Sequence, residues 1–315
     1  MTHLDQPTYS EPPEECDVED REAFIAFRAK RLEWLALLRD DPEHSIYSQL
    51  SSLVWQDSVF RLFNEIWRTT PPDQPTALRN SALAEALGSG YVTGMILGVG
   101  RLTDPAERKA ERGVVSLRRV FEDICNHRHL LTRENFVCCN NRYYDPDTIP
   151  PPSARGGIGG GFIGIASNLF DAPKLHPRFD ILSGVAPSKR SRRDLIVEAK
   201  FAEIEALLSV PSIARIRDLR NKFIAHAADA HSRQAASVGK FNFTLGQGEE
   251  ALHTLCQVFQ ILRGDILCSF DGPIVPVAQF SVLEGLTEPA ILPGQRKGLM
   301  ETWHQLTKER NDWLN

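Results

Sequence analysis

The chain has 315 residues, 42% hydrophobic and 24% charged, the composition of an ordinary globular protein with one large core or two smaller ones. Its formal net charge of −5 and sequence pI of about 6.0 give no overall attraction to nucleic acid, so RNA binding would need a local basic patch. No apolar run reaches the roughly eighteen residues of a membrane span, and the acidic, polar start is unlike a secretory signal. We therefore expect a cytoplasmic protein without a membrane segment.

Apolar residues at helical spacing predict an all-α fold. An acidic lead over residues 1–15 is expected to be disordered. The third expected helix is rich in glycine and nearly uncharged, and its Gly94-x3-Gly98 spacing predicts tight packing in the core. Asp104-Pro105 has the residues of a helix start, a capping side chain followed by proline. The expected helices of this half lie at about 18–39, 44–68, 76–101 and 114–128.

The helical pattern breaks between about 140 and 189, where prolines 150–152 and the glycine-rich run 156–161 (Gly-Gly-Ile-Gly-Gly-Gly) interrupt any regular element. Such a long insertion is a functional loop or a disordered one. Its glycine run lacks the Gly-Lys-Ser/Thr ending of a P-loop, which favours a flexible insertion over a nucleotide site. Residues 239–244 alternate briefly, as a short extended segment would. A helical domain is expected over 16–270, with further helices at about 192–208, 211–228 and 248–267, and a C-terminal extension over 271–315 with an amphipathic helix at about 295–314.

The cysteines and histidines predict neither a metal site nor a disulfide framework. The six cysteines lack Cys-x-x-Cys spacing, and Cys138 and Cys139 are adjacent, which suits free thiols in a reducing compartment. His127, His129 and His231 match no metal-ligand spacing. We expect no metal and no cofactor.

The expected helix after Pro211 carries the residues with the clearest chemical meaning. Ile213, Ile216, Leu219 and Phe223 form one apolar stripe, which Arg220 and His226 border from opposite sides, about 120° apart at 100° per residue. Border residues of this kind are common on core helices, so geometry alone permits a purely structural interpretation. If the stripe packs against its own copy, two Arg/His pairs converge at the seam of a two-fold dimer.

The residues from Arg220 to Asp229 read Arg-Asn-Lys-Phe-Ile-Ala-His-Ala-Ala-Asp. This string resembles the Arg-Asn-Lys-x-x-Ala-His-x-x-Asp string of the HEPN superfamily, particularly its abortive-infection AbiU-type branch. Residues 100–105 (Gly-Arg-Leu-Thr-Asp-Pro) and 115–117 (Val-Ser-Leu) are similar to the passage that precedes the signature helix in that branch. The two passages anchor roughly residues 20–270, whereas the insertion and the tail beyond about 270 have no counterpart in the resemblance.

The resemblance implies a HEPN-like helical bundle that acts as a metal-independent endoribonuclease. His226 would exchange protons with the ribose 2′-hydroxyl and the leaving 5′-oxygen, Arg220 would stabilise the charge on the phosphate, and Asn221 would orient the phosphate or the imidazole. It also implies a homodimer, an RNA substrate, a role in phage defence or as the toxin of a toxin–antitoxin pair, and an antitoxin or other regulatory protein as partner. The alternative is a catalytically silent HEPN module that binds RNA, nucleotide or a protein through the same dimer face.

A basic cluster precedes the signature helix. Arg190, Arg192 and Arg193 are nearly consecutive, and together with Lys222 they form the local patch that an acidic protein needs to bind RNA. A solvated junction between a loop and a helix explains the same residues equally well.

Overall fold

The computed structural model describes residues 9, 11–41, 43–74, 76–106, 113–145, 172–225, 228–235, 240–269, 274, 281–292 and 294–313. Within these ranges the chain forms eleven α-helices and no β-strand, which confirms the predicted all-α class. The helices are α1 (Arg21–Leu35), α2 (Ile46–Thr69), α3 (Ser81–Leu102), α4 (Leu117–Asn126), α5 (Arg133–Cys138), α7 (Ala172–Ser183), α8 (Glu198–Leu208), α9 (Pro211–Leu219), α10 (Ala230–Ala235), α11 (Leu245–Gln260) and α12 (Arg296–Asp312). A π-helical turn directly follows three of these helices: Ala36–Asp40 follows α1, Arg220–Ile224 follows α9, and Ile261–Ile266 follows α11.

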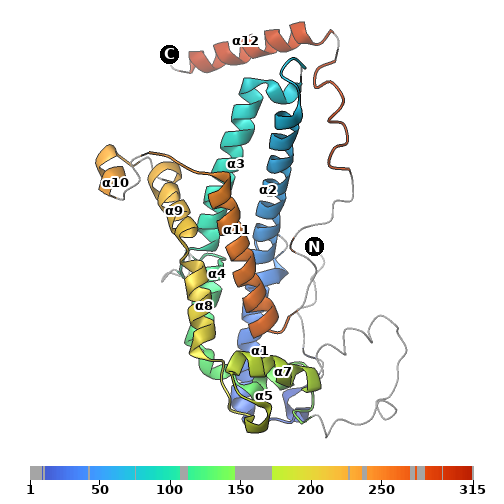
Figure 1. Cartoon of the computed structure of the whole chain (residues 1–315), viewed down its shortest axis with the longest axis vertical. Coiled ribbons are helices and arrows are strands. Elements are labelled where there is room, and N and C mark those ends of the chain that lie inside the picture. The colour runs from blue at the N-terminus through green and yellow to red at the C-terminus, as the bar shows by residue number, and fades with distance from the viewer. Residues whose placement is uncertain are drawn as a thin grey trace.

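The molecule is an elongated bundle (Figure 1). Helices α2 and α3 run side by side along its length, and α11 packs against both of them as well as against α8 and α9. Helices α1, α5 and α7 gather at the lower end, and α12 lies crosswise at the upper end. The apolar side chains of α1–α9 and α11 join in one continuous core.

Helix starts follow from local capping residues. Ser45 accepts a hydrogen bond from the backbone N–H of Ser48 at the start of α2, and Asn80 accepts one from Leu83 at the start of α3. Thr244 and Gln247 form a reciprocal capping box at the start of α11. Residues 240–244, which we predicted to be extended, therefore lead into this cap, and no strand pairing occurs there.

The predicted irregular insertion over 140–189 is wrong for its last part, which forms helix α7. Prolines 173 and 177 hid the helix in the sequence, because proline removes a backbone donor. The helix forms nonetheless, since Leu175, Phe179 and Leu182 are at most 3% exposed and pack into the core. Residues 146–171, including the glycine-rich loop, lie outside the described ranges.

The predicted lead over 1–15 ends in structure rather than disorder. Pro13–Glu15 forms a short 3-10 turn, and the guanidinium of Arg28 donates to the carbonyl of Glu11 at 2.6 Å. The lead is therefore tied to α1 at its end, while residues 1–8 lie outside the described part of the chain.

Helix α3 is long and apolar enough to cross a membrane by length and composition, and among the described residues it alone meets this test. Core helices of water-soluble proteins pass the same test. The end of α3 near Leu102 is indeed core, with Met95, Ile96 and Val99 at most 1% exposed. Gly98 lies so close to α2 that a Cβ atom there would stand 2.5 Å from Leu53 Cδ2, which confirms the tight packing predicted from the glycine spacing.

A candidate active site at Arg220

Arg220 stands where the regular helix α9 gives way to a wider turn. Ile213, Ile216 and Leu219 are fully buried and fix α9 against α3 and α11. From Arg220 to Ile224 the chain forms a π-helical turn, in which the N–H of residue 225 donates to the Arg220 carbonyl at 2.7 Å. Such turns occur often at functional sites. Helix α9 thus ends earlier than the predicted range of 211–228, because residues 220–224 leave α-helical geometry.

The guanidinium of Arg220 is held on two of its three nitrogens. Nη1 lies 2.8 Å from each carboxylate oxygen of Asp104, and Nε donates to Asn221 Oδ1 at 3.1 Å. No hydrogen bond from Nη2 occurs within the described part of the chain. The Arg220 side chain is 17% exposed and that of Asp104 27%, so the pair is screened less than a fully exposed one. Among the residues that the structure describes, one amino group of this fixed guanidinium therefore has no acceptor.

Gly100 makes room for this side chain. A Cβ atom at position 100 would lie 2.5 Å from Arg220 Cδ and 2.8 Å from its Nη1. Arg220 thus crosses α3 at a place where only a hydrogen atom fits.

Asp104 is in turn fixed by the start of α4. The hydroxyl of Ser116 donates to the Asp104 carbonyl at 2.6 Å and accepts the N–H of Arg119 at 3.1 Å, so one buried side chain caps α4 and anchors the Asp104 backbone. Gly100, Asp104 and Ser116 all belong to the upstream passage singled out in the sequence. That passage and the Arg220 string, more than 100 residues apart in the chain, meet at one ion pair.

The other residues of the predicted site have different surroundings. Asn221 is exposed and touches Arg220, while Lys222 Nζ donates to Ser232 Oγ at 2.8 Å. His226 lies outside the described residues, so its distance from Arg220 stays a prediction. The structure therefore brings Arg220 and Asn221 together and adds Asp104, which the sequence placed in the upstream passage and as a helix start. That helix start is wrong, since residues 104–106 are not helical and Ser116 caps α4.

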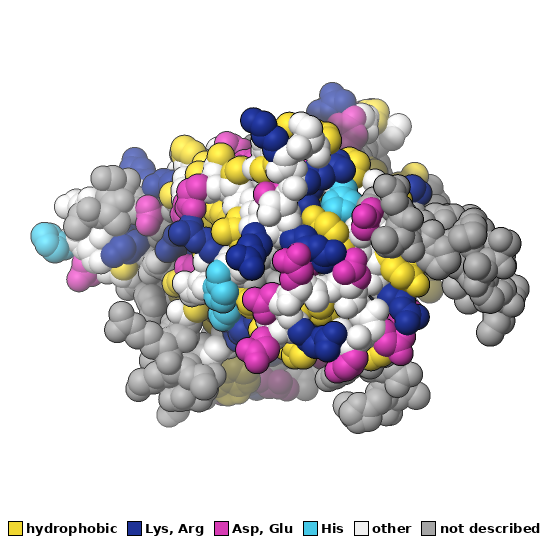
Figure 2. All heavy atoms as spheres, turned by 90° about the horizontal axis from the view of Figure 1, so that it is seen from below, with side chains coloured by type: hydrophobic (Ala, Val, Ile, Leu, Met, Phe, Trp, Pro, Cys, Tyr) yellow, Lys and Arg dark blue, Asp and Glu magenta, His cyan; other side chains and the backbone are white. Residues whose placement is uncertain are grey.

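The basic cluster is largely neutralised by ion pairs. Arg190 donates to both oxygens of Asp180, and hydrogen bonding to Arg190 holds the pKa of that carboxyl below its usual value. Arg192 contacts the carboxylates of Asp17 and Glu134, at 3.0 and 2.7 Å. Figure 2 shows the lower end of the molecule, where blue and magenta side chains alternate instead of separating into a basic face. RNA contacts by Arg190 and Arg192 stay a prediction, and their present partners are acidic.

Arg193 differs from its neighbours. It is exposed, and no ion pair to it occurs among the residues that the structure describes. It lines a cavity of about 670 Å³ whose wall mixes basic side chains (Arg21, Arg192, His129) with acidic ones (Glu19, Asp20, Glu22, Glu134).

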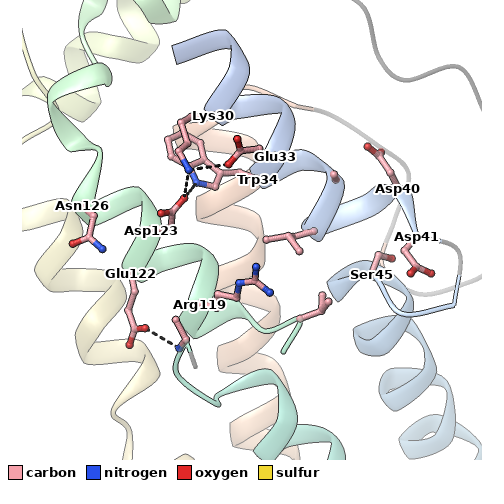
Figure 3. Close-up of a pocket in the computed structure, with 14 residues that line it drawn as sticks. Lys30, Glu33, Trp34, Asp40, Asp41, Ser45, Arg119, Glu122, Asp123 and Asn126 are labelled. Atoms are coloured by element: carbon pink, nitrogen blue, oxygen red, sulfur yellow. Dashed lines mark hydrogen bonds and ion pairs between the residues drawn. The ribbon is translucent and has the colours of Figure 1, made fainter. Parts of the chain in front are cut away.

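A cavity of about 820 Å³ was not predicted from the sequence (Figure 3). It lies between α1 and α4, beside the passage that holds Arg220, since Ala106 and Val115 line it. Asp123 accepts from the indole N–H of Trp34 at 2.7 Å and lies 3.4 Å from Lys30 Nζ. Carboxylates outnumber cations in its wall, so the cavity suits a nucleic-acid phosphate poorly. Its lining residues are Lys30, Glu33, Trp34, Ala36, Leu37, Asp40, Asp41, Ser45, Ala106, Val115, Arg119, Glu122, Asp123 and Asn126.

The apolar stripe of α9 is not free to form a dimer seam. Ile213, Ile216 and Leu219 are 0% exposed, because they pack inside their own chain. The dimer arrangement that we considered for this stripe is therefore wrong: an isolated helix pattern cannot tell a core face from an interface.

No group of three or more potential metal-ligating side chains occurs in the described ranges. Comparison of the chain with protein-family models, with curated proteins and with solved structures gave no match.

Proposed function

We propose that the protein is a metal-independent endoribonuclease of the HEPN type, with Arg220, Asn221 and His226 as its catalytic residues. The observation that supports this most is the state of Arg220. Its guanidinium is fixed by Asp104 and Asn221, belongs to a side chain that is 17% exposed, and keeps one amino group without a partner among the described residues. A preorganised cation with a free donor is what stabilisation of a phosphate in reaction requires.

The proposed reaction is attack of a ribose 2′-hydroxyl on the adjacent phosphorus. His226 takes the 2′-hydroxyl proton as a neutral imidazole and gives it to the leaving 5′-oxygen as an imidazolium, since an unperturbed histidine pKa of about 6.5 permits both near neutral pH. The new bond joins the 2′-oxygen to phosphorus, and the bond from phosphorus to the 5′-oxygen breaks. Arg220 Nη2 donates to the phosphate as its charge increases, and the products are a 2′,3′-cyclic phosphate and a 5′-hydroxyl.

The biological role that fits such an enzyme is phage defence or growth arrest in the cytoplasm, as the toxin of a toxin–antitoxin pair. Its partners are then the RNA substrate and an antitoxin or other regulatory protein. The second candidate is a catalytically silent HEPN module that binds RNA, nucleotide or a protein. The two differ in whether RNA is cut, and that is directly measurable.

The test is incubation of the full-length protein with total RNA in EDTA, beside Arg220→Ala and His226→Ala. Arg128→Ala and His253→Ala serve as matched controls, because both residues are exposed and lie outside the proposed site. Cleavage to 2′,3′-cyclic phosphate ends in wild type and controls, and its loss in both site variants, supports the enzyme. RNA that stays intact with every protein supports the silent module. Cleavage that survives His226→Ala refutes the proposed mechanism.

A further inference from the structure

The half-buried Arg217 has no role that contacts within the chain explain. It lies on α9 three residues before Arg220, and its side chain makes no hydrogen bond or ion pair to any residue that the structure describes. Its Nε is enclosed by protein atoms and has no acceptor among them. A buried guanidinium nitrogen without a partner costs free energy, and a folded protein rarely keeps one without a reason. A contact with a molecule outside the chain would supply that reason.

The segment around Arg217 is the kind of local basic surface that an acidic chain needs to bind RNA. The chain has a formal net charge of −5. Residues 211–225, by contrast, carry a single carboxylate, Asp218, against four cations: Arg215, Arg217, Arg220 and Lys222. Arg217 lies on the same side of the buried stripe as Arg220. At 100° and 1.5 Å per residue, the two side chains start about 60° apart around α9 and about 4.5 Å apart along it.

Arg217 and Arg220 are held differently, and this separates their expected tasks. Asp104 and Asn221 fix the guanidinium of Arg220, as stabilisation of a reacting phosphate requires. The guanidinium of Arg217 has no such partner in the described part of the chain, which suits a phosphate whose charge does not change during the reaction. Side chains three residues apart on a helix have Cβ atoms about 5–6 Å apart, which is of the order of the separation between neighbouring phosphates of one strand. Each guanidinium can therefore take its own phosphate.

We propose that Arg217 binds the RNA phosphate next to the one that is cut. The proposal rests on the proposed nuclease site, because Arg220 defines which phosphate is cut. Arginine presents planar, forked donors that match a phosphate. A contact of this kind is equally strong before and during the reaction, so it lowers KM and leaves kcat unchanged.

The first test measures binding and needs no cleavage. The probe is a fluorescein-labelled single-stranded RNA whose 2′-O-methyl groups block the attacking hydroxyl. Its affinity for the full-length protein is measured by fluorescence anisotropy over a range of salt concentrations, with circular dichroism as the control for folding. Arg217→Ala is expected to weaken binding about 10-fold and to lower the salt slope by about 0.7, the value for one phosphate of a single strand. Arg217→Lys should keep the slope, because it keeps the charge.

Arg215→Ala is the matched control for the binding test. Arg215 is also a half-buried arginine of α9, but it lies on the opposite side of the buried stripe, about 140° from Arg220. Its removal takes the same charge from the same helix. The salt slope should nevertheless stay at the wild-type value.

The second test measures cleavage of a defined RNA. Arg217→Ala should raise KM about 10-fold at unchanged kcat, whereas Arg220→Ala should lower kcat. Each phosphate beside the cleaved bond is then replaced in turn by an uncharged methylphosphonate. On one of the two sides, this replacement should raise KM for the wild type and remove the difference between wild type and Arg217→Ala.

The two tests separate this proposal from the proposed nuclease function. A wild type that binds the RNA without cutting it refutes the nuclease, and a slope lowered by Arg217→Ala alone then still supports Arg217 as a phosphate-binding residue. The proposal for Arg217 is overturned by a wild type that does not bind RNA, by an unchanged slope with Arg217→Ala, or by an equal change with Arg215→Ala. A slope lost equally with Arg217→Lys, or a kcat that falls at unchanged KM, overturns it as well.

Discussion

Gly100→Ala changes the position of the Arg220 side chain without changing its charge or any other polar group. The added methyl would lie 2.5 Å from Arg220 Cδ, whereas ordinary contact begins at 3.4 Å, so the side chain must move by about 0.9 Å. Arg220 is flexible and partly exposed, and it moves in preference to the backbone of α3. Its bonds to Asp104 and Asn221 then break or lengthen.

The expected change in stability is small. Loss of charge-assisted hydrogen bonds to Asp104 costs about 1.5–3 kcal/mol. Alanine in the interior of α3 returns about 0.5–1 kcal/mol relative to glycine. The free energy of unfolding should therefore fall by about 1–2 kcal/mol. RNA cleavage should fall much further, by about 100-fold, since a displacement near 1 Å of a catalytic group has that effect.

Urea denaturation and initial rates of RNA cleavage measure the two quantities. A double-mutant cycle with Arg220→Ala and Asp104→Ala gives the coupling energy between the two side chains, which we expect at about 1.5–3 kcal/mol in the wild-type background and near zero with Gly100→Ala. Asp104→Glu, which keeps the charge, should restore part of the rate lost with Asp104→Ala. Unchanged coupling with Gly100→Ala, or full cleavage activity, would refute the reasoning.

Three further predictions concern the charged residues around α7. Arg133→Ala should destabilise the protein by about 3–5 kcal/mol in urea denaturation, because Arg133 is fully buried and its removal takes the ion pair from Asp194 and leaves Asp180 with Arg190 alone; a loss below about 1 kcal/mol would contradict this. Arg190 lowers the pKa of Asp180 in the folded protein. Ionised Asp180 therefore stabilises the fold above the unfolded pKa of about 3.9, and this stabilisation is lost as the pH falls through the pKa of the folded state. Asp180→Asn should therefore flatten the decline in the free energy of unfolding below about pH 4. Arg193→Ala should reduce the salt slope of RNA binding, measured by fluorescence anisotropy, by about one, whereas Arg190→Ala should mainly lower stability; equal slopes for both variants would argue against a role for Arg193.

The sequence predicted the long helices well because their buried faces repeat at regular spacing. α2 and α11 lie close to the expected ranges, and their buried residues, such as Leu50 and Leu255, are those on the apolar side. It missed α5 and α7 for two physical reasons. Helix α5 has six residues, too few for a periodic pattern, and α7 contains Pro177, which local rules treat as a break. In both, long-range packing outweighs local preference, as the buried Phe136 and Phe179 rings show, 5.2 Å apart.

The sequence singled out residues of the candidate site, but it did not predict the contacts between them. The Arg220 string and the Asp104 passage were both singled out, but their ion pair joins positions 116 residues apart, and no local pattern reports such a contact. The sequence did not predict the close approach of Arg220 to Gly100 either. A glycine in a helical pattern indicates close approach without saying what approaches.

The π-helical turn explains why the angular argument about Arg220 and His226 needs revision. A separation of about 120° assumes 100° per residue from Ile213 onward, but hydrogen bonds from residue i to i+5 begin at Arg220 and widen the turn. Each residue of a wider turn advances by less than 100° around the helix axis. Residues after Leu219 therefore lie at smaller angles than a regular α-helix continuing α9 would give them. Phe223 illustrates this difference: it is only partly buried, packed against Phe241, although the wheel assigns it to the buried stripe with Ile216. A helical wheel drawn from Ile213 therefore describes the chain only as far as Leu219, and the expected angle between Arg220 and residue 226 stays a prediction.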